Sequence, residues 1–198
     1  MSEPARRRSG GARDRLHAAA LELFSENGVS ATSLQMIADR LGVTKAAVYH
    51  VYRTKDEIVL GLLRPLLQRL TQLTEDAEAR PRREEQLDVL VTGLVDLVVE
   101  NRQLAAVLAG DPFVKHLFHA DPTTEVGSAR IERLLMGPDP TPDDRVVAVM
   151  VGAALFEAGM AEPLSDLPGD VLARHLRANA LRLLRVGSDE SAASTSLM

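Results

Sequence analysis

Two short helical segments separated by a glycine turn constrain the fold of this chain more than any other feature of its sequence. The first has apolar residues at the spacing of one helix face, at Leu34, Ile37, Ala38 and Leu41. Gly42 ends that helix, because glycine tolerates the left-handed conformation that follows a last helical turn. Thr44 then caps a second short helix over residues 45–50. Two short helices joined by a tight turn predict a helix-turn-helix.

A longer helix is expected before this motif. It begins near Arg13 and ends at Gly28, and its apolar face consists of Leu16, Ala20, Leu23 and Phe24. Thr32 and Gln35 then fit a capping box. In such a box the threonine hydroxyl accepts a hydrogen bond from the backbone N–H of Gln35, and the glutamine side chain reaches back. The box predicts that the first short helix starts just after Thr32.

The helix after the motif is expected to be long, and it opens with a second capping box, Thr54 to Glu57. Residues 58–73 are rich in leucine but include Gly61 and Pro65. A proline inside a helix removes one backbone hydrogen bond and clashes with the carbonyl four residues earlier. Two alternatives stay open: one helix kinked between these residues, or two helices joined there.

The rest of the chain has the pattern of further helices, without the alternation typical of a strand. We expect them over residues 87–98, 102–109, 112–137, 143–160 and from 168 or 170 to 186, with a break at Asp121-Pro122 as the alternative to a continuous helix over 112–137. The predicted fold is therefore all-α, with a three-helix helix-turn-helix domain and a C-terminal bundle, about nine helices in all. The predicted divisions are a flexible basic arm at 1–12, the helix-turn-helix domain at 13–57, the bundle at 58–186 and a disordered tail at 187–198.

The composition excludes several classes of protein. Of the 198 residues, 45% are hydrophobic, which is enough to bury a core. There is no cysteine, so disulfides, zinc-thiolate sites, iron–sulfur clusters and cysteine nucleophiles are excluded. The longest nearly apolar run, Val146 to Phe156, is too short to span a bilayer, and no apolar segment follows the basic residues Arg6 to Arg8 as it would in a signal peptide. We expect a cytoplasmic protein.

The net charge of −5 at pH 7 is unevenly distributed. Residues 1–55 hold nine Lys and Arg against five acidic residues, whereas residues 56–198 hold 14 against 23. A basic end on an acidic body predicts that only the N-terminal end meets a polyanion. The alternative is an ordinary fluctuation of charge with a basic tail.

A helix-turn-helix reads DNA when its second helix enters the major groove. We expect that helix to present Lys45, Ala46, Tyr49 and His50, with Lys45 the best candidate for a base contact. Candidates for phosphate contacts are the hydroxyls and free N–H groups at the helix starts and one further lysine: Thr32, Ser33, Thr44 and Lys55. Tyr49 as a core aromatic and His50 as a solvated residue are the alternatives. The basic residues Arg6 to Arg8 either reach the minor groove or form a solvated tail.

The run from Thr32 to Glu57 resembles the DNA-binding domain of the tetracycline-repressor (TetR) family. The shared pattern is a threonine, an Ile-Ala pair, Gly-Val-Thr, an aliphatic residue before Tyr49, a second aromatic residue, and a lysine followed by acidic residues. The similarity covers about residues 13–60. Tyr52 stands where the family usually has phenylalanine, and Ala46 where it often has glycine or another small residue. The acidic helical remainder is similar only in length and number of helices.

The resemblance implies a homodimer that binds a palindromic operator and is built through the C-terminal helices. The residues also favour this, because residues 143–160 are apolar on all sides and the last helix carries a leucine stripe. The expected interface residues are Val146, Val149, Met150, Ala153, Leu172, Leu176 and Leu183. The alternative is that one chain covers both helices by itself.

Candidate ligand-binding residues are polar or aromatic residues on otherwise apolar helices: Thr92, Asp96, Phe113, His116 and Phe118. A solvated or core position is the alternative for each. His116 and His119 have a spacing that two metal ligands on a helix can adopt, with Asp111 and Asp121 near them, but such pairs are common by chance. We therefore expect no metal and no cofactor.

The function expected from these features is a DNA-binding transcriptional regulator that responds to a ligand. We expect a repressor released from its operator by a small, largely apolar molecule, with Pro65 as the pivot of the linking helix. The alternatives are a DNA-binding regulator without a ligand, or an activator. An enzyme is unexpected, because no nucleophile–base pair or glycine-rich phosphate loop is found in the sequence.

Overall fold

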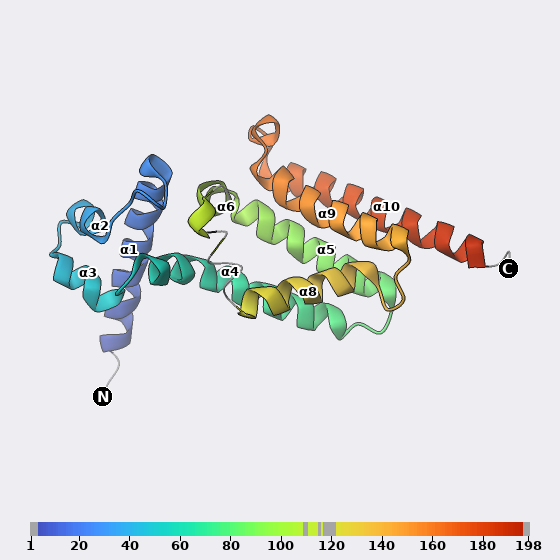
Figure 1. The fold of residues 1–198 in the computed structure, drawn as a ribbon, viewed down its shortest axis with the longest axis horizontal. Helices are drawn as coiled ribbons and strands as arrows, with labels where there is room; N and C mark the ends of the chain where they lie inside the picture. The colour runs from blue at the N-terminus through green and yellow to red at the C-terminus, as the bar shows by residue number, and fades with distance from the viewer. Residues whose placement is uncertain (1–3, 109–110, 115, 117–121, 196–198) are drawn as a thin grey trace. The chain divides into compact units, whose positions relative to one another are not determined.

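The computed structural model describes the backbone of residues 4–108, 111–114, 116 and 122–195, and the side chains of residues 11–108, 111–114, 116 and 127–185. Within these residues the chain is all-helical, with no strand, which confirms the predicted fold class (Figure 1). The elements are α1 Pro4–Asn27, α2 Leu34–Leu41, α3 Lys45–Val51, α4 Lys55–Glu78, α5 Arg83–Glu100, α6 Arg102–Leu108, α8 Pro122–Met136, α9 Pro142–Met160, the 3₁₀ turn η1 Glu162–Leu164 and α10 Gly169–Thr195. In the described part of the chain no helix is long and apolar enough to cross a membrane.

The chain folds as two units. The N-terminal unit comprises residues 1–65 and 106–120, and the C-terminal unit comprises residues 66–105 and 121–198. This division differs from the single boundary predicted between residues 57 and 58. The sequence gives no sign that the segment after α6 packs with the N-terminal helices, because its partners lie about 80 residues earlier in the chain.

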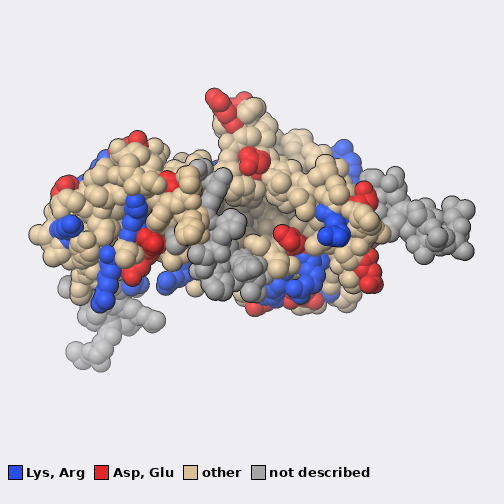
Figure 2. Space-filling view, in the orientation of Figure 1, with Lys and Arg blue, Asp and Glu red and all other residues tan. Residues whose placement is uncertain are grey.

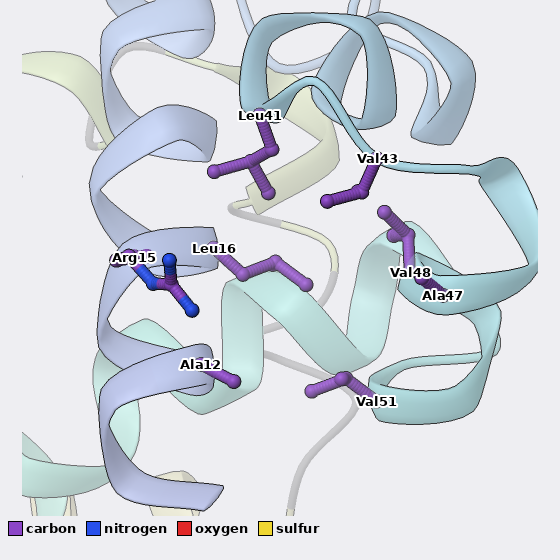
Figure 3. Close-up of a pocket in the computed structure, with 8 residues that line it drawn as sticks. All are labelled: Ala12, Arg15, Leu16, Leu41, Val43, Ala47, Val48 and Val51. Atoms are coloured by element: carbon purple, nitrogen blue, oxygen red, sulfur yellow. The ribbon is translucent and has the colours of Figure 1, made fainter. Parts of the chain in front are cut away.

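The core of the N-terminal unit forms where α1 packs against the helix-turn-helix. The predicted face of α1 is buried, with Leu16, Ala20, Leu23 and Phe24 at most 4% exposed. Figure 3 shows Leu16 directed toward Leu41, Val43 and Val48, around a small hollow of about 120 Å³. These contacts fix how the helix-turn-helix lies on α1.

The two short helices are capped by side chains, although one cap differs from the prediction. Ser33, not Thr32, is the N-cap of α2, and its hydroxyl accepts a hydrogen bond from the backbone N–H of Met36. Gly42 ends α2 with φ of 65°, and Thr44 caps α3, both as predicted. The capping box between Thr32 and Gln35 is wrong, because the side chain of Gln35 bonds Asp39 instead.

Helix α4 is one helix with Pro65 inside it, so the alternative of two separate helices does not apply. Thr54 accepts a hydrogen bond from the N–H of Glu57, as its capping box predicts, while the Glu57 carboxylate accepts from the N–H of Arg53. The boundary between the two units falls at Pro65.

The C-terminal unit is a bundle in which α5 contacts α8, α9 and α10 (Figure 1). Its core consists of apolar side chains from these helices and α4, with Leu90, Val91, Val95 and Val151 at most 1% exposed. Two arginines bind backbone carbonyls at the ends of this bundle. Arg83 donates to the carbonyls of Leu134 and Leu135, and burial lowers its pKa, which Asp144 partly opposes. Arg102 donates to three more, those of Gly159, Leu164 and Leu167.

Both ends of the chain differ from the prediction. Helix α1 begins at Pro4, inside the arm predicted to be flexible, and α10 continues to Thr195, through most of the tail predicted to be disordered. Extending a helix that has already formed costs far less than starting one, so polar residues can continue a helix that the core has nucleated.

Candidate nucleic-acid interface

Helix α3 presents most of its surface to solvent. Of its seven residues only Val48 is buried, and it holds the helix against the core. Lys45, Ala46 and His50 are exposed, and Tyr49 is 43% exposed. The Lys45 ammonium lies 5.5 Å from the centre of the Tyr49 ring, so a cation–π contact orients this pair. The structure thus brings the four residues predicted for base and backbone contacts onto an exposed surface.

The hydroxyls at the helix starts fall into two groups. Ser33 and Thr44 are exposed caps of α2 and α3. Thr32 is only 2% exposed, and its hydroxyl donates to the carbonyl oxygens of Leu23, at 3.2 Å, and Gly28, at 2.9 Å. The predicted phosphate contact of Thr32 is therefore corrected: its side chain ties the turn after α1 to the end of that helix.

Lys55, at the start of α4 as predicted, binds the turn after α1. Its ammonium donates to the carbonyl oxygens of Val29, at 2.7 Å, and Ser30, at 2.9 Å, and lies 5.3 Å from the centre of the Phe113 ring. Two of the three ammonium donors are thus used within the protein, and the phosphate contact of Lys55 stays a prediction.

Asp111 binds the same turn from the other side. Its carboxylate accepts hydrogen bonds from the backbone N–H groups of Val29, Ser30 and Phe113, at 2.9–3.2 Å, and from the Ser30 hydroxyl. Burial raises the pKa of Asp111, but these hydrogen bonds outweigh burial and hold the pKa below its ordinary value. We call Asp111 and Lys55, with the residue 28–30 turn between them, the turn clamp. Sequence reasoning missed it and considered Asp111 only as a neighbour of the two histidines.

A second polar contact joins α1, the end of α3 and α4. The His17 imidazole and the Tyr52 hydroxyl share a hydrogen bond of 2.7 Å, and their rings stack. A Cβ atom at Gly61 would lie 2.5 Å from the Tyr52 oxygen, so glycine is required where this pair approaches α4. Burial lowers the pKa of His17, which Asp14 partly opposes. The hydroxyl that distinguishes Tyr52 from the family's usual phenylalanine is used in this contact.

Ion pairs neutralise part of the positive charge of the N-terminal segment. Arg40 pairs with Glu22, at 3.1 Å, and with Glu26, at 2.5 Å, so α2 is bridged to α1. In the view of Figure 2 this end of the chain carries blue and red side chains side by side. Among the described residues, Lys45 and Arg53 are exposed cations near α3. These two cations are therefore available to attract a polyanion to α3.

The predicted ligand residues are divided between the two units. Thr92 and Asp96 line a groove of about 420 Å³ between α5 and α10, in the C-terminal unit. Phe113 lies in the N-terminal unit under Lys55, and His116 is exposed. Phe118 lies outside the described residues. Thr92 and Asp96 thus share a groove, while a ligand contact at Phe113, His116 or Phe118 stays a prediction.

The predicted interface residues are mostly exposed. Val146, Val149 and Met150 of α9 are 55–64% exposed, and Leu183 of α10 is 46% exposed. Ala153 of α9 is exposed as well. The two remaining residues are not, because Leu176 packs against the core and Leu172 is only 2% exposed. Leu172 is thus a core residue of its own chain, which corrects its assignment to the interface. Phe156, which was not predicted, adds a large exposed ring to α9.

In the described part of the chain no group of three or more potential ligands is placed to hold a metal ion. The carboxylate of Asp111 is used in the turn clamp, and His116 is exposed. His119 and Asp121 lie outside the described residues.

Comparison with known proteins agrees with this architecture. Residues 16–62 match the family model of bacterial regulatory proteins, tetR family. The chain is 35% identical over 66 residues to the HTH-type transcriptional repressor KstR2 of Mycolicibacterium smegmatis, and 26% identical over 90 residues to the fatty acid metabolism regulator protein of Bacillus subtilis. These matches cover 33% and 45% of this chain, and 30% and 46% of the two relatives' own lengths.

A solved structure extends the likeness of the fold to most of the chain. The ketosteroid transcriptional regulator KstR2 of Mycobacterium tuberculosis superposes with a TM-score of 0.66 and 19% sequence identity, over 86% of this chain and 93% of that one. The exposed second helix and the turn before it have the geometry of a helix-turn-helix, the motif that places its second helix in the major groove of DNA. Residues 16–62 are thus similar to the DNA-binding domain of the tetR family, and most of the chain shares the fold of the KstR2 structure.

Proposed function

We propose that this protein is a ligand-responsive repressor that binds a palindromic DNA operator as a homodimer. The observation that carries the proposal is α3, a short capped helix with one buried residue and an exposed face of Lys45, Ala46, Tyr49 and His50. A helix of this kind fits the major groove, and its lysine can donate to the O6 and N7 atoms of guanine. A relative described as a transcriptional repressor supports repression as the outcome.

Dimerisation is supported by the apolar surface on α9. Val146, Val149, Met150 and Phe156 are each about half exposed or more, and they lie on one helix together. A contiguous exposed apolar surface of this kind is typical of an interaction site. A two-fold dimer spaces two recognition helices one turn of DNA apart, about 34–36 Å, and so reads a palindrome.

The response to a ligand is supported by the way the chain passes between its two units. Helix α4 leaves the N-terminal unit at Pro65, which supports Pro65 as a pivot. Helix α6 starts at Arg102, bound to carbonyls of the C-terminal unit, and is followed by Asp111, bound to the turn of the N-terminal unit. A ligand shifts such a system only by its different affinities for the states that can and cannot bind DNA.

An operator-binding experiment tests the proposal. The homodimer is titrated onto the DNA upstream of its own gene in a gel-shift assay over a series of salt concentrations. We expect preference for a palindrome and affinity that falls steeply with salt. Lys45→Ala should weaken operator binding by about 1–3 kcal/mol and relax one base position in each half-site. Equal affinity for the upstream and for scrambled DNA would overturn the proposal.

The matched control is Arg182→Ala. Arg182 is an exposed arginine of α10, far in sequence from α3, and its substitution removes the same charge. We expect it to leave both the operator affinity and the base preference unchanged.

A further inference from the structure

We infer that the groove between α5 and α10 binds a small amphipathic carboxylate. The groove has a volume of about 420 Å³, within the range of small-molecule sites. Its lining comes from two helices that contact each other in the C-terminal unit: Thr92, Val95, Asp96, Ala173, Arg174, Arg177, Ala178 and Leu181. The inference names the ligand class of the sensor in the proposed function, and it rests on that function only for the role of the ligand.

The apolar part of the lining provides room for a hydrocarbon chain. Val95 is 1% exposed, and Ala173 and Leu181 are partly buried against the core of the unit. Ala178 adds a small side chain beside them. An apolar ligand group laid on these residues would remove apolar surface from water, which favours binding.

Two arginines supply the charge that would hold a carboxylate. Arg174 and Arg177 are one turn apart on α10, so their guanidinium groups lie on the same side of the helix. Both contacts of Arg177 to Asp88, at 3.0 and 3.2 Å, use Nη2, so the Nη1 and Nε donors are not used in that pair. Among the described side chains, Arg174 forms an ion pair only with Asp170, at 3.7 Å, and both side chains are at least two-thirds exposed. A guanidinium with free donors binds carboxylates in a bidentate geometry.

Thr92 provides a second, independent observation. Its hydroxyl oxygen is buried, and within the described part of the chain it has no hydrogen-bond partner. A buried polar group without a partner destabilises the protein that contains it, so such groups are rare unless they have a role. A ligand oxygen that reaches the hydroxyl would provide the missing partner.

Asp96 limits the charge of the ligand. It lies one turn after Thr92 on α5 and interacts electrostatically with Arg69, which donates its own hydrogen bond to Glu100. A carboxylate on the rim repels a ligand that carries several negative charges and accepts a hydrogen bond from a hydroxyl. The groove therefore suits a single carboxylate better than a phosphate or a nucleic acid.

The groove is separate from the surface assigned to dimerisation. Leu183 and the groove residue Leu181 are two positions apart on α10, which places their side chains on opposite sides of the helix. The other large exposed apolar residues assigned to the dimerisation surface belong to α9, which contributes nothing to the lining. A bound ligand and a second protein chain can thus be accommodated together.

Calorimetric titration of the full chain in the absence of DNA tests the inference, with octanoate as the probe and octylamine and octanol as probes of the same length. We expect octanoate to bind more tightly than either. Arg174→Ala should raise the dissociation constant of octanoate about tenfold, the effect of losing one charged hydrogen bond. Arg145→Ala, at an exposed position of α9, which contributes nothing to the lining, should leave it unchanged.

Thr92→Val distinguishes a threonine that binds the ligand from one with a merely structural role. Valine has nearly the same shape but no hydroxyl, so it removes the unpaired group. We expect the melting temperature to rise by about 2–4 °C while octanoate affinity falls severalfold. The inference is overturned if octanoate gives no binding up to about 10 mM, if octanol or octylamine binds as tightly, or if Arg174→Ala or Thr92→Val leaves its affinity unchanged.

Because DNA is absent from these titrations, their failure leaves the operator-binding result intact. Arg174→Ala is also measured in the gel-shift assay without ligand, where we expect the affinity of the wild-type protein. A loss of operator binding in that variant would show a defect of the fold and not of the ligand site, and Thr92→Val alone would then decide the inference.

Discussion

The N-terminal unit holds its loops with polar side chains, whereas the C-terminal unit is stabilised mainly by apolar packing. In the former, Thr32, Lys55 and Asp111 all bind backbone groups of the turn that joins α1 to α2 or of the residues next to it. In the latter, α5 is surrounded by apolar side chains, and arginines bind carbonyls only at the ends of the bundle. Directional hydrogen bonds fix the geometry of a small unit, while a core fixes mainly its stability.

Of the variants that test this contrast, we expect Leu90→Ala to change the free energy of unfolding most. Leu90 is completely buried in the C-terminal core, so its truncation should cost about 2–5 kcal/mol in the free energy of unfolding. Urea unfolding measures this loss. We expect the protein that remains folded to bind the operator with wild-type affinity. Val89→Ala, at a partly buried position of the same helix, is the control and should cost less than about 1.5 kcal/mol.

Gly61→Ala should have the next largest effect, in the N-terminal unit. The new methyl group would lie 2.5 Å from the Tyr52 oxygen and 2.9 Å from Nε2 of His17, and relieving this overlap should cost about 1–3 kcal/mol. The double variant with Tyr52→Phe should recover part of the loss, because the overlapping oxygen is gone. Gly127→Ala, in open space on α8, should be neutral or stabilising. An additive double variant would exclude the proposed contact.

Asp111→Ala should have a smaller effect on stability and a larger one on DNA binding. Loss of the hydrogen bonds to the 28–30 turn should cost about 1–2 kcal/mol and loosen the start of α2, so operator affinity should fall about tenfold. Asp139→Ala removes the same charge from an exposed loop and is the control. If Leu90→Ala and Asp111→Ala change operator affinity equally, the contrast between the units fails.

The pH dependence of the same variant follows from the lowered pKa of Asp111. Its contribution to stability is complete above the ordinary value of 3.8 and is lost as pH falls through the lower pKa of the folded state. The stability difference between wild type and Asp111→Ala should therefore be constant near neutral pH and shrink in acid. Denaturant unfolding at a series of pH values measures it, and a difference that grows in acid would contradict the assignment.

The helix-turn-helix could be predicted from sequence because its signals are local. The stripe of α2, Gly42 and the Thr44 cap all lie within twelve residues, and each acts on its own neighbours. The exception is the cap of α2, where two adjacent hydroxyl residues offered the same signal. Only the packing of α1 against α2, which buries Thr32 and leaves Ser33 exposed, decides between them.

The turn clamp and the groove could not be predicted in the same way, because they join distant segments. Asp111 follows the turn that it binds by about 80 residues, and no local pattern records that pairing. In the groove, Thr92 and Asp96 were found because they are one turn apart on one helix. Their partners Arg174 and Arg177 depend on the register between α5 and α10, which apolar stripes do not specify. The same ambiguity placed Leu172 at the interface, although it belongs to the core.

The discontinuous N-terminal unit has a consequence for protein engineering. A biosensor designed by fusing residues 1–65 to an unrelated sensing domain would lack Asp111 and Phe113, although both belong to the same unit as the transplanted helices. Lys55 would then meet the carbonyls of the 28–30 turn without the carboxylate that binds the turn's N–H groups. A functional graft has to include Asp111 and Phe113 as well. The helix-turn-helix and the residues that follow α6 therefore have to be transferred together.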